Sequence, residues 1–139
     1  MAWVYGTKIT EDRGDRVVTV RDLPEVQTSG DTLEHALALA EDAIAAIVMH
    51  RIEHGAELPP PSPIGDGEYG VSIPAQLAAK ASVYRLWKGA GISKSELARR
   101  MGVADNEAHR VLNPRHPTKL DALDRAARSL GARLRVSAA

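Results

Sequence analysis

Alternating apolar and polar residues near the beginning and the middle of the chain predict a small antiparallel β-sheet. Residues 3–9 and 16–20 are rich in β-branched and aromatic side chains, and the polar stretch 11–15, with its turn glycine, joins them as a hairpin. Residues 26–28 are compatible with a short third strand. Residues 69–73 alternate between apolar and small residues and are expected to form a last strand.

A long helix is predicted between the third and the last strand. Apolar residues recur at helical spacing from Leu33 to Val48, so one side of this helix is expected to cover the sheet. Asp31 or Thr32 is expected to cap its beginning, and Gly55 to end it. The first half of the chain is therefore predicted to be a ββ(β)αβ layer of sheet and helix.

The second half of the chain has helical patterns throughout. Helices are expected over residues 75–88, 94–101 and 105–112, and another from Thr118 to about residue 130. Gly102 lies where a tight turn between two helices needs a residue without a Cβ atom. The fold class predicted for the whole chain is α+β, with one domain over residues 1–74 and an all-α domain over residues 75–139.

Two local signals refine the helical half. Ser93 and Glu96 have the spacing of a capping box, in which the serine side chain caps the helix and the glutamate reaches back to the serine amide. Residues 132–136 alternate like a strand, and we expect this tail to help to form a dimer by pairing across a two-fold axis.

Composition limits the classes of protein to which the chain can belong. Its 139 residues include no cysteine, which excludes disulfides, thiolate metal sites and cysteine nucleophiles. No apolar run is long enough to cross a bilayer, and the first residues lack the layout of a signal peptide. We therefore expect a cytoplasmic protein with no membrane partner.

The net charge of zero conceals a division between Ala79 and Lys80. Up to Ala79 the chain has 5 Lys and Arg against 13 Asp and Glu, a balance of −8. From Lys80 onward it has 13 Lys and Arg against 5 Asp and Glu, a balance of +8. Two partners of opposite sign are indicated: a nucleic acid for the basic half and something basic for the acidic half.

The helical half resembles the helix-turn-helix domains of the Cro/repressor family. The resemblance begins in residues 92–103, which read ISKSELARRMGV, and continues through residues 110–113 and 120–131. It implies that residues 105–112 form the recognition helix and lie in the major groove of double-stranded DNA. We expect base contacts or proximity to bases from Asp105, Asn106, Glu107, His109 and Arg110, and phosphate contacts from Ser93, Lys94, Asn113, Arg115 and Lys119.

Two departures from that family pattern weaken the expected affinity of one isolated domain. Ala104 replaces a better helix cap, and Asp105 and Glu107 place two carboxylates in the recognition helix. A homodimer or higher homo-oligomer, presenting two such helices to half-sites about one DNA turn apart, is the usual remedy.

The order of motifs along nearly the whole chain resembles a more particular family, the HicB antitoxins that end in a helix-turn-helix. The residues that carry this likeness are 22–26 (DLPEV), 28–36 (TSGDTLEHA) and 58–63 (LPPPSP). The resemblance implies a partial RNase H-like fold at the N-terminus. It also implies neutralisation of HicA, a small basic mRNA-cleaving toxin, and binding of the complex to the promoter of its own operon.

The resemblance gives the −8 half a physical purpose, because an acidic surface can cover the RNA-facing surface of a basic toxin. Candidate residues for this contact are the acidic side chains of the helix and of the segment before it, namely Asp22, Glu25, Asp31, Glu34, Glu41 and Asp42.

Catalytic alternatives have weaker support. Two-metal hydrolysis of the RNase H type needs converging carboxylates, but the expected strand interiors contain none. His50, Glu53 and His54 match the H-x-x-E-H zinc pattern, yet they lie at the frayed end of a helix before a proline run. We expect no catalytic residue, no metal and no cofactor.

The alternative from another class is a stand-alone transcriptional repressor, in which the acidic domain senses a small molecule or mediates assembly. No apolar pocket and no phosphate-binding glycine loop is conspicuous in the sequence to favour it. A small basic reading frame beside the gene would favour the antitoxin, and its absence would exclude that role.

Overall fold

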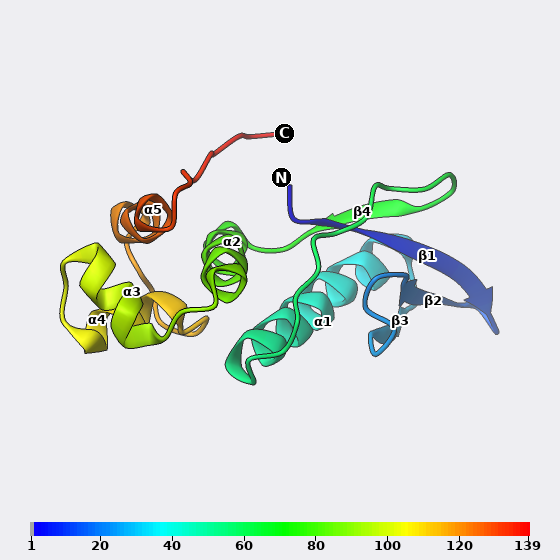
Figure 1. The fold of residues 1–139 in the computed structure, drawn as a ribbon. Coiled ribbons are helices and arrows are strands. Elements are labelled where there is room, and N and C mark those ends of the chain that lie inside the picture. The colour runs from blue at the N-terminus through cyan, green and yellow to red at the C-terminus, as the bar shows by residue number, and fades with distance from the viewer. Residues whose placement is uncertain (1) are drawn as a thin grey trace. The chain divides into compact units, whose positions relative to one another are not determined.

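The computed structural model describes residues 2–139, and these fold as two compact units (Figure 1). The first contains the residues up to Arg51 together with Pro59–Pro74. The second contains Ile52–Leu58 and Ala75–Ala139. A simple cut after Pro74 would place Ile52–Leu58 in the first unit, whereas their contacts group them with the helices.

The first unit contains a four-stranded antiparallel sheet in the order β3-β2-β1-β4. Its strands are β1 (Val4–Asp12), β2 (Asp15–Val20), β3 (Gln27–Gly30) and β4 (Tyr69–Ser72). The third strand begins one residue later and ends two residues later than its pattern indicated. The last strand pairs with β1, so it is an edge strand opposite β3.

A two-residue turn joins β1 to β2. Arg13 and Gly14 both have positive φ angles, 52° and 86°, and Asp12 pairs with Asp15 across the turn. Two successive positive φ angles are typical of the primed turns that match the twist of a hairpin. The ladder therefore continues to the turn, and β1 ends three residues later than predicted.

Helix α1 (Leu33–Glu53) covers one face of the sheet, as its apolar pattern predicted (Figure 1). Thr32 Oγ1 accepts a hydrogen bond from His35 N at 3.1 Å, which identifies Thr32 as the cap. Ile44 is fully buried, and burial of such a side chain contributes about 1.5–3 kcal/mol. A Cβ atom on Gly30 would lie 2.5 Å from Ala36 N, so the close approach of β3 to α1 requires glycine.

The second unit packs four helices around one apolar core. They are α2 (Ala75–Ala90), α3 (Lys94–Met101), α4 (Asp105–Leu112) and α5 (Leu120–Ser129). The core residues come from all four helices: Val83, Leu97, Ala98, Met101, Ala108, Val111, Leu112, Leu123 and Ala126. The α+β class and the predicted order of elements are confirmed.

The turn between α3 and α4 has the conformation that the sequence predicted. Gly102 has φ 72° and ψ 34°, its N–H donates to Arg99 O, and Val103 N–H donates to Ala98 O. This pair of bonds satisfies carbonyls at the end of α3 and requires a residue that tolerates left-handed backbone. Half-buried Val103 then packs against the core.

Two local expectations were wrong in part, and a third is not tested by a single chain. Ser93 caps α3 by accepting from Glu96 N, but the Glu96 carboxylate pairs with Arg99 and Arg100 rather than reaching back. Helix α5 begins at Leu120 rather than Thr118. The tail after Gly131 forms neither a helix nor a strand within the chain, so its pairing across a two-fold axis stays a prediction.

Candidate nucleic-acid interface and acidic docking surface

Helix α4 presents one polar side to solvent. Ala108, Val111 and Leu112 are buried in the helical core. His109 is exposed, and so are the four side chains near it that are predicted to face base edges: Asp105, Asn106, Glu107 and Arg110. An amphipathic helix of this kind leaves a complete polar side for a partner, while its apolar side fixes the angle to the other helices.

The first turn of α4 is bound to α3 through one of these side chains. Ser95 Oγ donates to Asp105 Oδ2 at 2.8 Å, and Ala104 at the cap position makes no side-chain bond. The hydroxyl thus engages one of the two carboxylates of α4. The side chains of Asn106 and Arg110 have no hydrogen bond or ion pair with any other of residues 2–139.

The predicted phosphate-binding residues differ in whether their side chains already have bonding partners. Lys94 and Lys119 make no side-chain bond to the rest of the described chain. Asn113 Oδ1 accepts from Arg115 N at 3.0 Å. The Arg115 guanidinium is bound by Glu53, with Nε–Oε2 at 2.8 Å and Nη2–Oε1 at 3.1 Å, and this pairing raises the pKa of Arg115.

Two carboxylates of the helical unit, Glu96 and Asp124, pair with four other arginines. Hydrogen bonds from Arg99 and then Arg100 lower the pKa of Glu96 to about 2. Asp124 accepts from Leu134 N, which is the main reason that its pKa is lowered, and it also pairs with Arg133 and Arg128. Five arginines of the basic half are therefore held in internal pairs.

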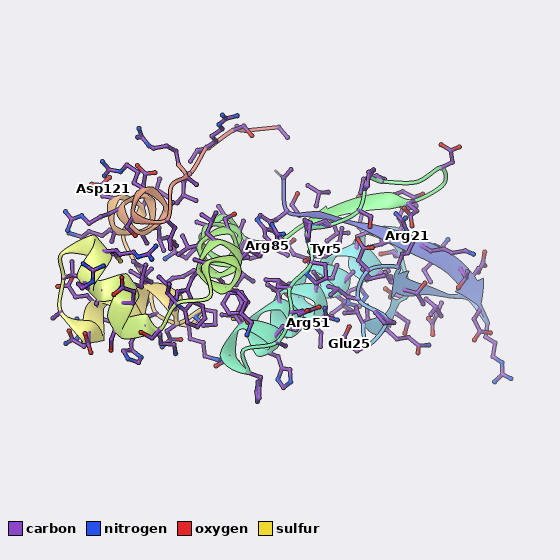
Figure 2. The ribbon with its side chains drawn as sticks, in the orientation of Figure 1. Tyr5, Arg21, Glu25, Arg51, Arg85 and Asp121 are labelled. Atoms are coloured by element: carbon purple, nitrogen blue, oxygen red, sulfur yellow. The ribbon has the colours of Figure 1, made fainter. Side chains whose placement is uncertain are left out.

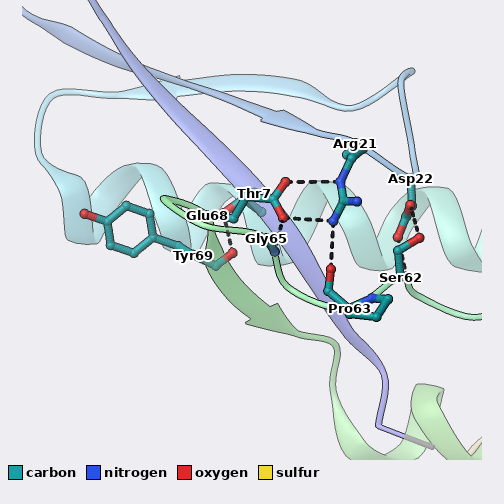
Figure 3. Close-up of polar contacts among 8 residues, drawn as sticks. All are labelled: Thr7, Arg21, Asp22, Ser62, Pro63, Gly65, Glu68 and Tyr69. Atoms are coloured by element: carbon teal, nitrogen blue, oxygen red, sulfur yellow. Dashed lines mark hydrogen bonds and ion pairs between the residues drawn. The ribbon is translucent and has the colours of Figure 1, made fainter.

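In the sheet-and-helix unit, Asp22 binds the proline-rich crossover, which is the segment that connects α1 to β4. Its carboxylate accepts from Ser62 N at 2.7 Å and from Ser62 Oγ at 2.8 Å (Figure 3). Beside it, Arg21 donates to Glu68 and to Pro63 O. These bonds hold the crossover against the end of β2, so Asp22 is a structural residue of the loop.

Two other acidic candidates are bound to side chains of the same unit. Both oxygens of Glu25 accept from Arg51 Nη2 at 3.0 Å, and the two side chains point toward each other in Figure 2. Asp31 lies 2.9 Å from His35 Nδ1, and this hydrogen bond lowers the pKa of Asp31. Both carboxylates stay partly accessible, but neither is unpaired.

The remaining three acidic candidates lie free on α1. Glu34, Glu41 and Asp42 are exposed, and their side chains have no ion pair or hydrogen bond to any other residue from 2 to 139. Glu34 and Glu41 are two helical turns apart, so their side chains leave the same side of the helix. Asp42 follows Glu41 directly, so its side chain leaves the helix about 100° further round.

The H-x-x-E-H motif ends at the exposed C-terminus of α1. Within residues 2–139, no group of three or more His, Cys, Asp or Glu side chains is arranged to hold a metal ion. Over the same residues, no helix combines the length and the apolar character needed to span a membrane.

Sequence reasoning missed Lys80, which is the most buried charged residue described, at 1 % exposure. Its Nζ donates to Arg110 O at 2.7 Å and to Thr118 Oγ1. A signal was present, because Lys80 interrupts the apolar stripe of Leu77, Ala81 and Tyr84. The pairs Arg21–Glu68 and Arg115–Glu53 join distant residues, and no sequence pattern pointed to them.

The chain matches a family model and is similar to known proteins. The family model described as HicB_like antitoxin of bacterial toxin-antitoxin system matches residues 4–82. Antitoxin HicB 2 of Photorhabdus laumondii is 36% identical over 134 residues, which cover 96% of this chain and 95% of the relative. Antitoxin HicB of Escherichia coli (strain K12) is 33% identical over 121 residues, covering 87% and 88%. The resemblance seen in the sequence is confirmed, and the chain belongs to the HicB-like antitoxin family of bacterial toxin-antitoxin systems.

Proposed function

We propose that this antitoxin neutralises a HicA-type mRNA-cleaving toxin and represses its own operon by binding operator DNA. The observation that carries the proposal is the separation of two free surfaces of different chemistry. One unit has unpaired carboxylates on α1, and the other has the solvent-facing polar side of α4. The family match supports the toxin as one partner.

Neutralisation follows from charge complementarity. A toxin that cleaves mRNA must bind phosphates, and a surface that binds phosphates is basic. Glu34, Glu41 and Asp42 offer such a surface three carboxylates without first breaking internal pairs. The antitoxin then occupies the RNA-binding surface, and opposite charges speed the encounter. This role consists of binding and needs no catalytic step, and it places the protein in the cytoplasm with the toxin's mRNA targets.

Operator binding uses the helical unit. Helix α4 enters the major groove, where Arg110 can read guanine and Asn106 can read adenine. Lys94 and Lys119 contact phosphates and fix the register. Two copies bind two half-sites about one DNA turn apart, with the tail after Gly131 joining the copies.

The test is co-expression of the full chain with the product of the adjacent small basic reading frame. Capture of that protein, with loss of its ribonuclease activity in the complex, is the expected result. Retention of a duplex from the gene's own promoter by the full chain is the second expected result. A captured protein that still cleaves mRNA, or no capture, would contradict the toxin part, and no retention would contradict the operator part.

A further inference from the structure

Lys80 places a buried cation beside the recognition helix. It lies in α2, it is 1 % exposed, and its ammonium group donates to two oxygens. One is Arg110 O, near the end of α4. The other is Thr118 Oγ1, in the segment between α4 and α5.

The C-terminus of a helix is a favourable place for a cation. The last carbonyls of a helix lack intrahelical partners and carry the negative end of the helix dipole. Arg110 O accepts from Asn113 N at 3.2 Å and from Lys80 Nζ at 2.7 Å. The buried ammonium therefore satisfies a carbonyl of the same residue whose side chain is free to face DNA.

Thr118 extends this contact to the segment after α4. Gln76, one turn before Lys80 in α2, donates from Nε2 to Thr118 O at 2.8 Å. His116 Nδ1 lies 3.1 Å from Thr118 Oγ1. Helix α2 thus holds both the end of α4 and the residue that precedes Lys119.

Burial of this charge is costly for the fold. Desolvation lowers the pKa of Lys80 from 10.5 to about 8, so the ammonium form is less stable in the protein than in water. Replacement of a buried ionic group by an apolar side chain of similar size is often neutral for stability. A cation at this place is therefore better explained by the orientation of α4 than by the stability of the fold.

We propose that Lys80 is a positioning residue for DNA recognition, because its ammonium group fixes the end of α4 and the Thr118 segment relative to α2. The inference rests on the proposed operator binding. Lys80 itself is buried and does not contact phosphate. It acts through the backbone of Arg110 and through the chain next to Lys119.

The test compares Lys80→Met with Lys88→Met in the full chain. Lys88 is an exposed lysine of the same helix, so both variants lose one positive charge from α2. The probe is a duplex from the gene's own promoter, titrated at several salt concentrations. Lys80→Met should weaken binding about tenfold more than Lys88→Met does, the scale of one lost base contact.

The salt dependence distinguishes positioning from direct contact. Lys80→Met should leave the slope of log affinity against log salt unchanged, whereas Lys119→Met should reduce it by about one. Equal affinities of Lys80→Met and Lys88→Met would overturn the proposal. A reduced slope in Lys80→Met would also overturn it, because Lys80 would then contact phosphate.

Hydrogen exchange tests the positioning without DNA. In Lys80→Met, amides of residues 112–119 should exchange faster while those of α3 keep their protection, and Lys80→Gln should restore part of the protection. A melting temperature that falls far enough to explain the loss of binding would count against positioning. Unchanged exchange would overturn it too. If the wild-type chain does not bind the duplex, operator binding fails, and the exchange result still decides the role of Lys80.

Discussion

The sheet-and-helix unit and the helical unit carry opposite charges, yet both hold many of their charged candidates in internal bonds. In the first, Asp22 binds the crossover and Glu25 binds Arg51. In the second, Glu96 and Glu53 hold arginines that would otherwise face a partner. The candidates left free differ in placement: three carboxylates lie on α1, and three cations lie on and around α4.

A charge balance indicates a class of partner but does not indicate which charged side chains are free to meet it. An ion pair between exposed groups adds little to stability, typically under about 1 kcal/mol, so its main effect here is to remove charges from the available surface. Fewer charged side chains are consequently free to meet a partner than the −8 and +8 totals indicate. The four predictions below concern these free and bound charges.

Charge reversal on α1 should have the largest effect. The triple variant Glu34→Lys, Glu41→Lys and Asp42→Lys should weaken toxin binding about 100-fold or more, because three attractive contacts become repulsive. Isothermal titration of the purified toxin into the full chain measures it. The matched control reverses Glu11, Asp12 and Asp15 at the hairpin, which are equally exposed. Equal losses in both triples would show that only the total charge matters.

Loss of the Arg110 side chain should come next. Arg110→Ala should weaken operator binding about 10- to 100-fold, the range for one bidentate base contact, and should relax specificity at one base position. Binding to a set of duplexes with single base changes measures both. A uniform loss across all duplexes would show instead that Arg110 contacts phosphate.

Release of Arg115 from Glu53 should have a smaller effect of opposite sign. Glu53→Gln removes the carboxylate that competes with phosphate for the guanidinium, so operator affinity should rise about two- to fivefold. Glu57→Gln, four residues further along the chain, is the control for the loss of a negative charge. The same rise in both variants would refute specific competition at Arg115.

The pH dependence of stability should show the smallest effect. Unfolded chains keep Lys80 protonated up to its ordinary pKa of 10.5, whereas the folded protein releases that proton from about pH 8. The unfolded state then binds more protons, so the free energy of unfolding rises with pH across this window. Urea unfolding at about pH 7 and about pH 9.5 should show wild type gaining stability relative to Lys80→Met. A constant difference would contradict the lowered pKa.

The parts of the fold that the sequence predicted depend on local chemistry. Helices α3 and α4 have their predicted bounds because Ser93 and Gly102 set the beginning of one helix and the turn after it. The start of α5 was missed because Thr118, which has the chemistry of a cap, uses its hydroxyl for Lys80, 38 residues away in the chain. A tertiary bond replaced a local one.

The same distinction applies to the candidate surfaces. Exposure of Arg110 on α4 follows from the amphipathic pattern of eight residues. The pairing of Arg115 with Glu53 joins residues 62 positions apart, and that of Glu25 with Arg51 joins residues 26 apart. Periodicity does not encode such contacts. Sequence reasoning therefore predicted candidate surfaces but could not separate bound from free charges.

In the proposed function, toxin and operator bind to separate surfaces, one on each unit. The most direct test measures both affinities for the α1 triple variant and for Arg110→Ala in one series. The triple variant should lose the toxin and keep the operator, while Arg110→Ala should keep the toxin and lose the operator. Loss of both partners in either folded variant would contradict two separate surfaces.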